Sequence, residues 1–215
     1  MLKPKVPIAH EGVPFIGIFA FLTILAAIFS FNCLTIIFLL ITAFTLYFFR
    51  DPERFVPEDE NAIICPADGK IIVMERVSEN PFIEGHAFKV SIFMNVFNVH
   101  VNRNPIAGKV EKIIYKPGQF YSADSKKGAE YNENCGVIVE TANSKKIAYV
   151  QVAGLIARRI VCWLEKGDTV TAGKRFGLIR FGSRVDLYLP VDAVIEVKLG
   201  DKVRSGETIL GYISE

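Results

Sequence analysis

The stretch between Glu11 and Arg50 contains no charged residue, and its length limits what the N-terminal part of the chain can form. It is 38 residues long. As one straight helix it would extend about 57 Å, whereas the hydrocarbon core of a bilayer is roughly 30 Å thick. Two helices of about 17 residues each, separated near Ser30-Phe31-Asn32, fit that thickness better. We therefore predict a membrane hairpin, with a helical hairpin buried in a soluble protein as the alternative.

Basic residues on both sides of this stretch predict its orientation. Lys3 and Lys5 precede it, and Arg50 and Arg54 follow it. A hairpin places both basic flanks on the same side of the membrane, and the positive-inside rule makes that side cytoplasmic. The stretch is too long for a cleaved signal peptide and lacks a small-residue cleavage site. We expect the protein at the cytoplasmic face of the cell membrane.

Composition excludes several other classes of function. The net charge of +2 gives no electrostatic reason to bind nucleic acid. The four cysteines are scattered without a C-x-x-C pair, which indicates neither a zinc site nor a disulfide framework and fits a reducing compartment. The three histidines are too few and too far apart in sequence for a multi-histidine centre, so we expect no metal.

Beyond residue 54 the sequence has the pattern of a β-rich domain. Short apolar runs are separated by Gly, Pro or Asn every 8 to 15 residues, as in a sandwich or barrel. These runs are 70–77, 87–94, 108–115, 135–141, 146–154, 186–190 and 193–199. Only the segment 155–164 has the pattern of a helix within this part. The predicted fold class is α+β, mainly β, with residues 1–54 as a hydrophobic hairpin and linker and residues 55–215 as the second domain.

One internal repeat supports this fold. The sequence KGDTVTAGKRF at 166–176 recurs as LGDKVRSGETI at 199–209, with the shared pattern G-D-x-V-x-x-G. The Gly-Asp pair predicts a turn, and the second Gly predicts another turn. The Val between them is expected at a core position. This pattern resembles the hammerhead hairpins of biotinyl and lipoyl carrier domains. Those carriers present a modified lysine, usually within Met-Lys-Met, and the chain has no such tripeptide.

The dipeptide Gly182-Ser183 interrupts two runs that otherwise have the pattern of strands. Gly-Ser is common at a β-bulge or a tight hairpin corner, which is the simpler interpretation. The second interpretation is that the Gly-Ser bond is itself reactive. Asp68 lies in CPADGKI and His100 in FNVHVNRNP, and Ser, His and Asp are the parts of an activated nucleophile. Each residue alone also has an ordinary structural explanation.

Several motifs together resemble the short form of the phosphatidylserine decarboxylase proenzymes. They occur in the order FFRDPER, PADGKI, FNVHVNRNPIAGKV, GAEYNENCGV, QVAGLIARRIV, GDTVTAGKRFGLIRFGSRVDLYLP and GDKVRSGETILG. The resemblance extends from about residue 48 to the C-terminus, and the apolar N-terminal pair is also typical. The motif here is Phe-Gly-Ser-Arg rather than the Leu-Gly-Ser-Thr of the long form. Phe97 stands where the long form has a second histidine, so no role is expected for that extra histidine.

The resemblance implies a self-processing enzyme. Ser183 would attack the carbonyl of Gly182, with His100 as base and Asp68 orienting the imidazole. Cleavage would give a β chain (residues 1–182) and an α chain (residues 183–215). Residue 183 would become a covalent pyruvoyl group, which forms a Schiff base with the substrate amine and serves as the electron sink, so no external cofactor is needed. The two chains would form a heterodimer, with further oligomerisation left open.

The same resemblance implies the substrate. It is phosphatidylserine, decarboxylated to phosphatidylethanolamine, and a membrane hairpin fits such a lipid. Candidate contacts for its phosphate or carboxylate are Arg103, Arg158 and Arg159, each of which could equally be a solvated arginine. His86 is assigned no role. Three alternatives remain: a decarboxylase of archaetidylserine, a membrane-tethered hammerhead carrier without catalysis, and a membrane-anchored metallopeptidase, for which clustered ligands are lacking.

Overall fold

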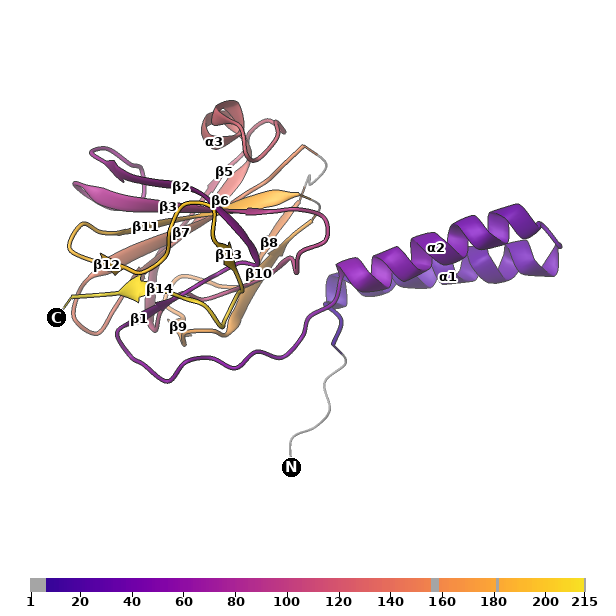
Figure 1. Cartoon of the computed structure of the whole chain (residues 1–215), viewed down its shortest axis with the longest axis horizontal. Helices are drawn as coiled ribbons and strands as arrows, with labels where there is room; N and C mark the ends of the chain where they lie inside the picture. The colour runs from indigo at the N-terminus through magenta and orange to yellow at the C-terminus, as the bar shows by residue number, and fades with distance from the viewer. Residues whose placement is uncertain (1–6, 156–158, 181, 215) are drawn as a thin grey trace. The chain divides into compact units, whose positions relative to one another are not determined.

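The computed structural model describes residues 7–155, 159–180 and 182–214. The chain divides into two compact units, Met1–Glu53 and Arg54–Glu215 (Figure 1). Each unit has its own architecture, and the two are described separately below. The self-cleavage boundary at 182/183 lies within the second unit and stays a prediction.

The first unit is a pair of helices. A short 3-10 turn, η1 (His10–Gly12), leads into α1 (Val13–Ile28), and α2 (Asn32–Phe48) returns beside it. Ser30 makes the turn between them with φ of 58°, a left-handed conformation. The base of the pair is closed by a hydrogen bond of 2.8 Å from the Ala9 N–H to the Phe49 carbonyl. The predicted break near residues 30–32 thus falls where the helices turn.

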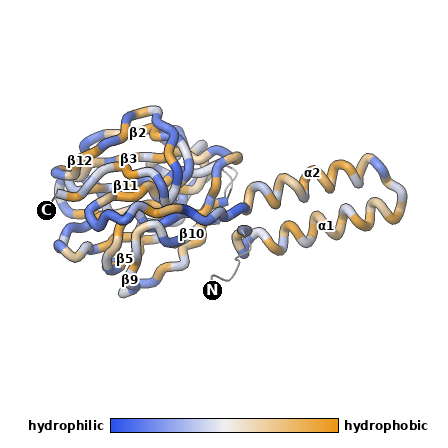
Figure 2. The backbone as a smooth tube through the Cα atoms, turned by 60° about the horizontal axis from the view of Figure 1, so that its bottom comes forward, coloured by the Kyte–Doolittle hydropathy of each residue, from blue (hydrophilic) through white to orange (hydrophobic). Residues whose placement is uncertain are grey.

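Most side chains of this pair are exposed. Most of its residues are also hydrophobic, as the colouring of both helices in Figure 2 shows. The continuous helical segment His10–Ile28 is long and apolar enough to cross a membrane by length and composition, and α2 is a shorter apolar helix of 17 residues. Exposed apolar helices of this kind are stable in water only when something covers them. The pair therefore indicates association with a membrane.

The second unit is built from three antiparallel sheets. An eight-stranded sheet has the order β13-β2-β3-β11-β7-β6-β5-β9, and two three-stranded sheets have the orders β1-β14-β12 and β4-β10-β8. The strands are β1 (Ala62–Ile64), β2 (Gly69–Val77), β3 (Ala87–Met94), β4 (Val101–Arg103), β5 (Gly108–Lys116), β6 (Asn134–Glu140), β7 (Lys146–Val152), β8 (Ile160–Cys162), β9 (Thr169–Val170), β10 (Arg175–Ile179), β11 (Ser183–Pro190), β12 (Val194–Ile195), β13 (Lys202–Val203) and β14 (Ile209–Tyr212). The predicted fold class, α+β and mainly β with N-terminal apolar helices, is confirmed.

The predicted helix over 155–164 is wrong. Ile160–Cys162 forms β8, which pairs with Gly177–Ile179 of β10. Residues 156–158 of that segment lie outside the described part of the chain. The one helix in the second unit that the structure describes is α3 (Lys126–Tyr131), capped by the Ser125 side chain, which accepts a hydrogen bond from the Gly128 N–H.

The internal repeat forms two matching turns. Gly167 and Gly200 have φ of 97° and 95°, a conformation that favours glycine. The next residue in each copy, Asp168 or Asp201, accepts a side-chain hydrogen bond of 2.8 Å from the backbone N–H three residues earlier. One turn leads to β9, which pairs with β5, and the other leads to β13, which pairs with β2. The repeat therefore closes both edges of the large sheet.

Strand β11 lies in the middle of that sheet, between β3 and β7 (Figure 1). Every side chain from Ser183 to Leu189 is buried. Its apolar residues join the main core, which includes Ile71, Ile92, Val137, Tyr149, Phe176, Val185 and Leu187. The segment that begins at Ser183 is thus held on both sides by hydrogen-bonded neighbours, and its first residue occupies a fixed place in the fold.

Candidate active site

The Gly182-Ser183 bond lies at a junction between two sheets. Strand β10 belongs to the three-stranded sheet with β4 and β8, whereas β11 belongs to the eight-stranded sheet. The two strands do not pair with each other, so the interpretation of Gly-Ser as a tight hairpin corner is wrong. Gly182 has φ of 63°. A Cβ in that conformation costs about 1–2 kcal/mol, although within the described part of the chain a Cβ at this position would meet no atom within 4 Å.

The Ser183 side chain is buried and makes no hydrogen bond to any described residue. Its exposed fraction is 0%, and among the described residues no group forms a hydrogen bond with its Oγ atom. Ser183 is the first residue of β11 and lies opposite Met94, the last residue of β3. Buried hydroxyl groups are nearly always hydrogen-bonded, and an exception often marks a site of chemistry.

The connection between β3 and β4 brings His100 to the same end of the domain. It leaves β3 at Met94, opposite Ser183, and its last residue is His100, whose carbonyl accepts a hydrogen bond of 3.3 Å from the Ile179 N–H. His100 is fully buried. The two ends of this connection, Met94 and His100, therefore contact Ser183 and Ile179, the two residues on either side of 180–182.

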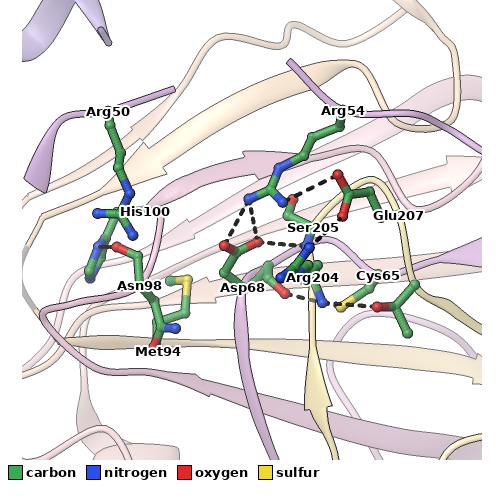
Figure 3. A network of polar contacts seen from close by, with 12 residues as sticks. Arg50, Arg54, Cys65, Asp68, Met94, Asn98, His100, Arg204, Ser205 and Glu207 are labelled. Atoms are coloured by element: carbon green, nitrogen blue, oxygen red, sulfur yellow. Dashed lines mark hydrogen bonds and ion pairs between the residues drawn. The ribbon is translucent and has the colours of Figure 1, made fainter. Parts of the chain in front are cut away.

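The contact of the His100 ring defines which nitrogen can act as a base. Its Nδ1 atom lies 2.9 Å from the carbonyl oxygen of Asn98 (Figure 3). Because a carbonyl oxygen can only accept, Nδ1 must carry the hydrogen and donate it. In the neutral ring Nε2 then has the lone pair, and it is the nitrogen that can accept a proton. The backbone of Asn98 thus fixes the tautomer.

Asp68 is held in a different network (Figure 3). Its carboxylate accepts hydrogen bonds from Arg54 Nη2 at 2.8 and 3.1 Å and from the Ser205 N–H at 2.8 Å. Arg54 also reaches Glu207, at 3.4 Å. In the part of the chain that the structure describes, none of the Asp68 contacts is to His100. The role of Asp68 in orienting the imidazole therefore stays a prediction.

The three candidate arginines have different environments. Arg103 is buried and donates from Nη1 to the Gly173 carbonyl at 3.0 Å, within the first copy of the repeat. Arg159 is exposed, and its carbonyl accepts a hydrogen bond from the Arg180 N–H. Arg158 lies outside the described residues. Contact of any of them with substrate stays a prediction.

A buried ion pair directly after Ser183 was not anticipated. Arg184 is 2% exposed, and its Nε and Nη2 atoms lie 2.7 and 2.9 Å from the two carboxylate oxygens of Asp186. Its Nη1 atom donates to the Ala123 carbonyl at 3.0 Å. The Nη2 contact is a hydrogen bond and the Nε contact is an ion pair, so the two opposite charges compensate each other inside the domain. The alternation of polar residues in RVDLYL gives no sign of it, because surface strands have the same pattern.

A pair of thiols lies beside β10. A hydrogen bond from Cys135 on β6 lowers the pKa of the Cys162 thiol on β8 to about 7, against the opposing effect of burial. The same hydrogen bond, together with burial, raises the pKa of Cys135. Neither cysteine is in a disulfide. The sequence suggested no partner for either, because the pairing depends on strands that are distant along the chain.

Comparison with known proteins gives a consistent result. The family model described as phosphatidylserine decarboxylase matches residues 41–211. A phosphatidylserine decarboxylase proenzyme of Desulfotalea psychrophila is 71% identical over 213 residues, covering 99% of this chain and 100% of that protein. Proteins with the same name from Pelobacter propionicus and Geotalea uraniireducens are 50% and 46% identical, each with 99% of this chain and 100% of its own length covered. The resemblance predicted from the motifs is confirmed, and the chain belongs to the phosphatidylserine decarboxylase family.

Proposed function

We propose that the chain cleaves itself between Gly182 and Ser183 and then decarboxylates phosphatidylserine to phosphatidylethanolamine. The observation that carries this proposal is the buried Ser183 hydroxyl, which has no hydrogen-bond partner among the described residues and directly follows a left-handed glycine. Leaving such a group unsatisfied costs about 1–3 kcal/mol, and Ser183, unlike the equally buried Ser91, directly follows a glycine with a positive φ. The relatives are named proenzymes, in agreement with a processed chain.

Self-cleavage needs only groups of this chain. Ser183 Oγ attacks the carbonyl carbon of Gly182 while Nε2 of His100 accepts the hydroxyl proton. The bond from that carbon to the Ser183 nitrogen breaks, which leaves an ester on Oγ and a free amine on residue 183. Loss of the Cα proton of residue 183 then breaks the Cβ–Oγ bond. Residues 1–182 leave with a terminal carboxylate, and water releases the nitrogen of the remaining dehydroalanine as ammonia.

The product at residue 183 is a pyruvoyl group, for which this position is suitable. Because the group is made from Ser183 itself, its place is set by the pairing of β11 with β3 and β7. A pyruvoyl ketone condenses with the substrate's amine and withdraws the electrons that remain when CO2 leaves. The chain supplies a buried environment for this group. The hydrogen bond from Nδ1 of His100 to the Asn98 carbonyl fixes the tautomer in which Nε2 can accept a proton.

The two proposed chains remain one unit through contacts that do not depend on the cleaved bond. Residues 183–190 pair with β3 on one side and β7 on the other, and β14 pairs with β1. The Asp68 contact with the Ser205 N–H and the Arg54 contact with Glu207 also link residues before and after the cleavage site. A heterodimer of residues 1–182 and 183–215 is therefore the expected product.

Exposed apolar side chains on segments that adjoin the site residues in sequence support a lipid substrate. Phe97, on the connection from Met94 to His100, is 62% exposed, and so is Leu155, which follows Gly154. Trp163, at the end of β8, is 42% exposed. Large apolar side chains at the edge of a site are suited to an acyl chain or a bilayer surface. Free serine would gain nothing from them.

Release of labelled CO2 in detergent micelles tests the substrate. With carboxyl-labelled phosphatidylserine we expect turnover, whereas carboxyl-labelled free serine should have a kcat/KM lower by about a hundredfold or more, since it lacks the phosphate and the tails that supply binding energy. Wild-type protein treated with borohydride, which reduces the ketone, is the control and should be inactive. Equal kcat/KM for the two substrates would contradict the lipid assignment.

We also propose that the helical pair inserts into the membrane with both ends on the cytoplasmic side. The basic residues Lys3, Lys5, Arg50 and Arg54 flank the uncharged stretch. Cysteines introduced at positions 2 and 55, each in a background in which Cys33 and Cys162 are replaced by Ser and the remaining Cys65 and Cys135 are buried, should react with a membrane-impermeant maleimide only in inverted vesicles. Labelling of the two positions from opposite sides would contradict the hairpin.

A further inference from the structure

Gly154 lies against the carbonyl that the proposed reaction attacks. A Cβ atom built on Gly154 would be 1.8 Å from the oxygen and 2.9 Å from the carbon of the Gly182 carbonyl. The backbone of Gly154 is not in the left-handed region, so its conformation alone does not require glycine. The requirement is for space, because real Cβ atoms do not approach other atoms within 3.0 Å.

The register of the sheet explains this approach. Strands β11 and β7 are antiparallel, with Arg184 opposite Val152. Continuing that register for two more residues places Gly182 opposite Gly154. Facing residues in an antiparallel pair can have Cα atoms only about 4.5 Å apart. At that distance a carbonyl group can tilt toward the facing residue only when that residue is glycine, because a Cβ would occupy the same space.

The backbone just before Gly154 is held firmly. The Ala153 N–H donates to the Glu133 carbonyl at 2.9 Å, and the Ala153 carbonyl accepts from Asn132 Nδ2 at 2.7 Å. Asn132 is 1% exposed, and its amide group also bonds both the N–H and the carbonyl of Tyr121, at 2.7 and 2.8 Å. Gly154 therefore belongs to a firmly held backbone, whereas among the described residues no atom beyond the chain neighbours lies within 4 Å of where a Cβ on Gly182 would be.

We propose that Gly154 is a positioning residue for self-cleavage, because its missing side chain lets the Gly182 carbonyl rest against a fixed backbone in the orientation that Ser183 attacks. This inference rests on the proposed cleavage between Gly182 and Ser183. A methyl group at position 154 would displace that carbonyl by more than about 1 Å. A displacement of that size costs about a hundredfold in rate when the reacting groups are otherwise held in place.

The test compares Gly154→Ala with Gly211→Ala. Gly211 is a matched control, since a Cβ there would be 2.0 Å from the Val194 carbonyl oxygen, in a different sheet. Conversion of freshly synthesised full-length precursor is followed by intact mass, and folding by thermal unfolding. We expect Gly154→Ala to cleave about a hundredfold more slowly than Gly211→Ala, while both variants lose a comparable amount of Tm.

Hydroxylamine trapping measures the rate of the first chemical step in the folded protein, and a loss of stability alone does not change that rate. Hydroxylamine cleaves the ester formed by Ser183 and leaves a hydroxamate on Gly182, so the rate of hydroxamate formation reports the first step. That rate should fall in folded Gly154→Ala and stay at the wild-type value in Gly211→Ala. A second variant, Asn132→Asp, loses the donor to the Ala153 carbonyl without adding an atom beside Gly182, and we expect cleavage to slow about tenfold.

The outcomes separate this inference from the proposed function. If the wild-type protein is not cleaved at Gly182-Ser183, the proposed function itself fails. If the wild-type protein is cleaved there and folded Gly154→Ala forms hydroxamate as fast as Gly211→Ala, only the positioning role is overturned. If Gly154→Ala does not fold, the Asn132→Asp variant decides: cleavage of that variant at the wild-type rate would overturn the positioning role of Gly154.

Discussion

The Ser183→Ala variant should remain a single full-length chain and release no CO2 from phosphatidylserine. Alanine lacks the oxygen that attacks the Gly182 carbonyl and from which the pyruvoyl group is made. Both cleavage and decarboxylation should therefore fall by more than about a thousandfold, the scale seen when a catalytic nucleophile is removed. The measurement is a denaturing gel with intact mass, followed by the labelled-CO2 assay.

Ser91→Ala is a matched control for this experiment. Ser91 is also fully buried, its Oγ atom also has no hydrogen-bond partner among the described residues, and it lies on β3 opposite Asp186. The control should be cleaved and active like the wild-type protein, because its hydroxyl is not beside the reactive bond. A fragment of residues 183–215 from Ser183→Ala would show that another residue is the nucleophile.

The His100→Ala variant should accumulate uncleaved precursor. Removing a general base typically slows a reaction by about 10²–10⁴-fold, and the precursor's half-life should lengthen accordingly. Time-resolved intact mass after synthesis gives the rate. His86→Ala is the control, since His86 is exposed and lies in the turn between β2 and β3, and it should be cleaved normally. Normal cleavage in His100→Ala would assign this histidine to packing or to the later decarboxylation.

The same cleavage assay distinguishes two roles for Asp68. Asp68→Asn and Arg54→Gln both break the part-buried Asp68–Arg54 ion pair, so each should lower the free energy of unfolding by about 1–3 kcal/mol. If Asp68 orients His100, the Asn variant should cleave more slowly than the Gln variant at equal folded fraction. Equal rates would limit Asp68 to holding Arg54 and Ser205 in place.

Local sequence patterns predicted most of the sheet. The runs at 70–77, 87–94 and 146–154 became β2, β3 and β7, because short apolar runs bounded by turn residues suit strands that are largely buried. The repeat also predicted its turns, since Gly167 and Gly200 both need a positive φ. The segment 155–164 was mispredicted because the pairing that makes part of it a strand comes from β10, outside any local window.

Only part of the candidate site could be predicted from the sequence. Ser183 and His100 were predicted because their side chains carry recognisable chemistry; the structure places Ser183 opposite the last residue of β3 and His100 at the end of the connection that follows β3, and their catalytic roles stay predictions. The contributions of Asn98 and Gly154 could not be named. Asn98 acts through its backbone carbonyl and Gly154 through a missing side chain, and neither leaves a pattern in the sequence. The contact of Arg54 with Asp68 likewise depends on how the chain enters the domain.

Intact mass of the purified wild-type protein under denaturing conditions tests the central claim most directly. The account predicts two species. One is residues 1–182 with an ordinary C-terminal carboxylate, and the other is residues 183–215, lighter than the encoded peptide by one molecule of ammonia and without a free N-terminal amine. A single chain of residues 1–215 in active protein, or a fragment 183–215 that retains an unmodified N-terminal serine, would contradict it.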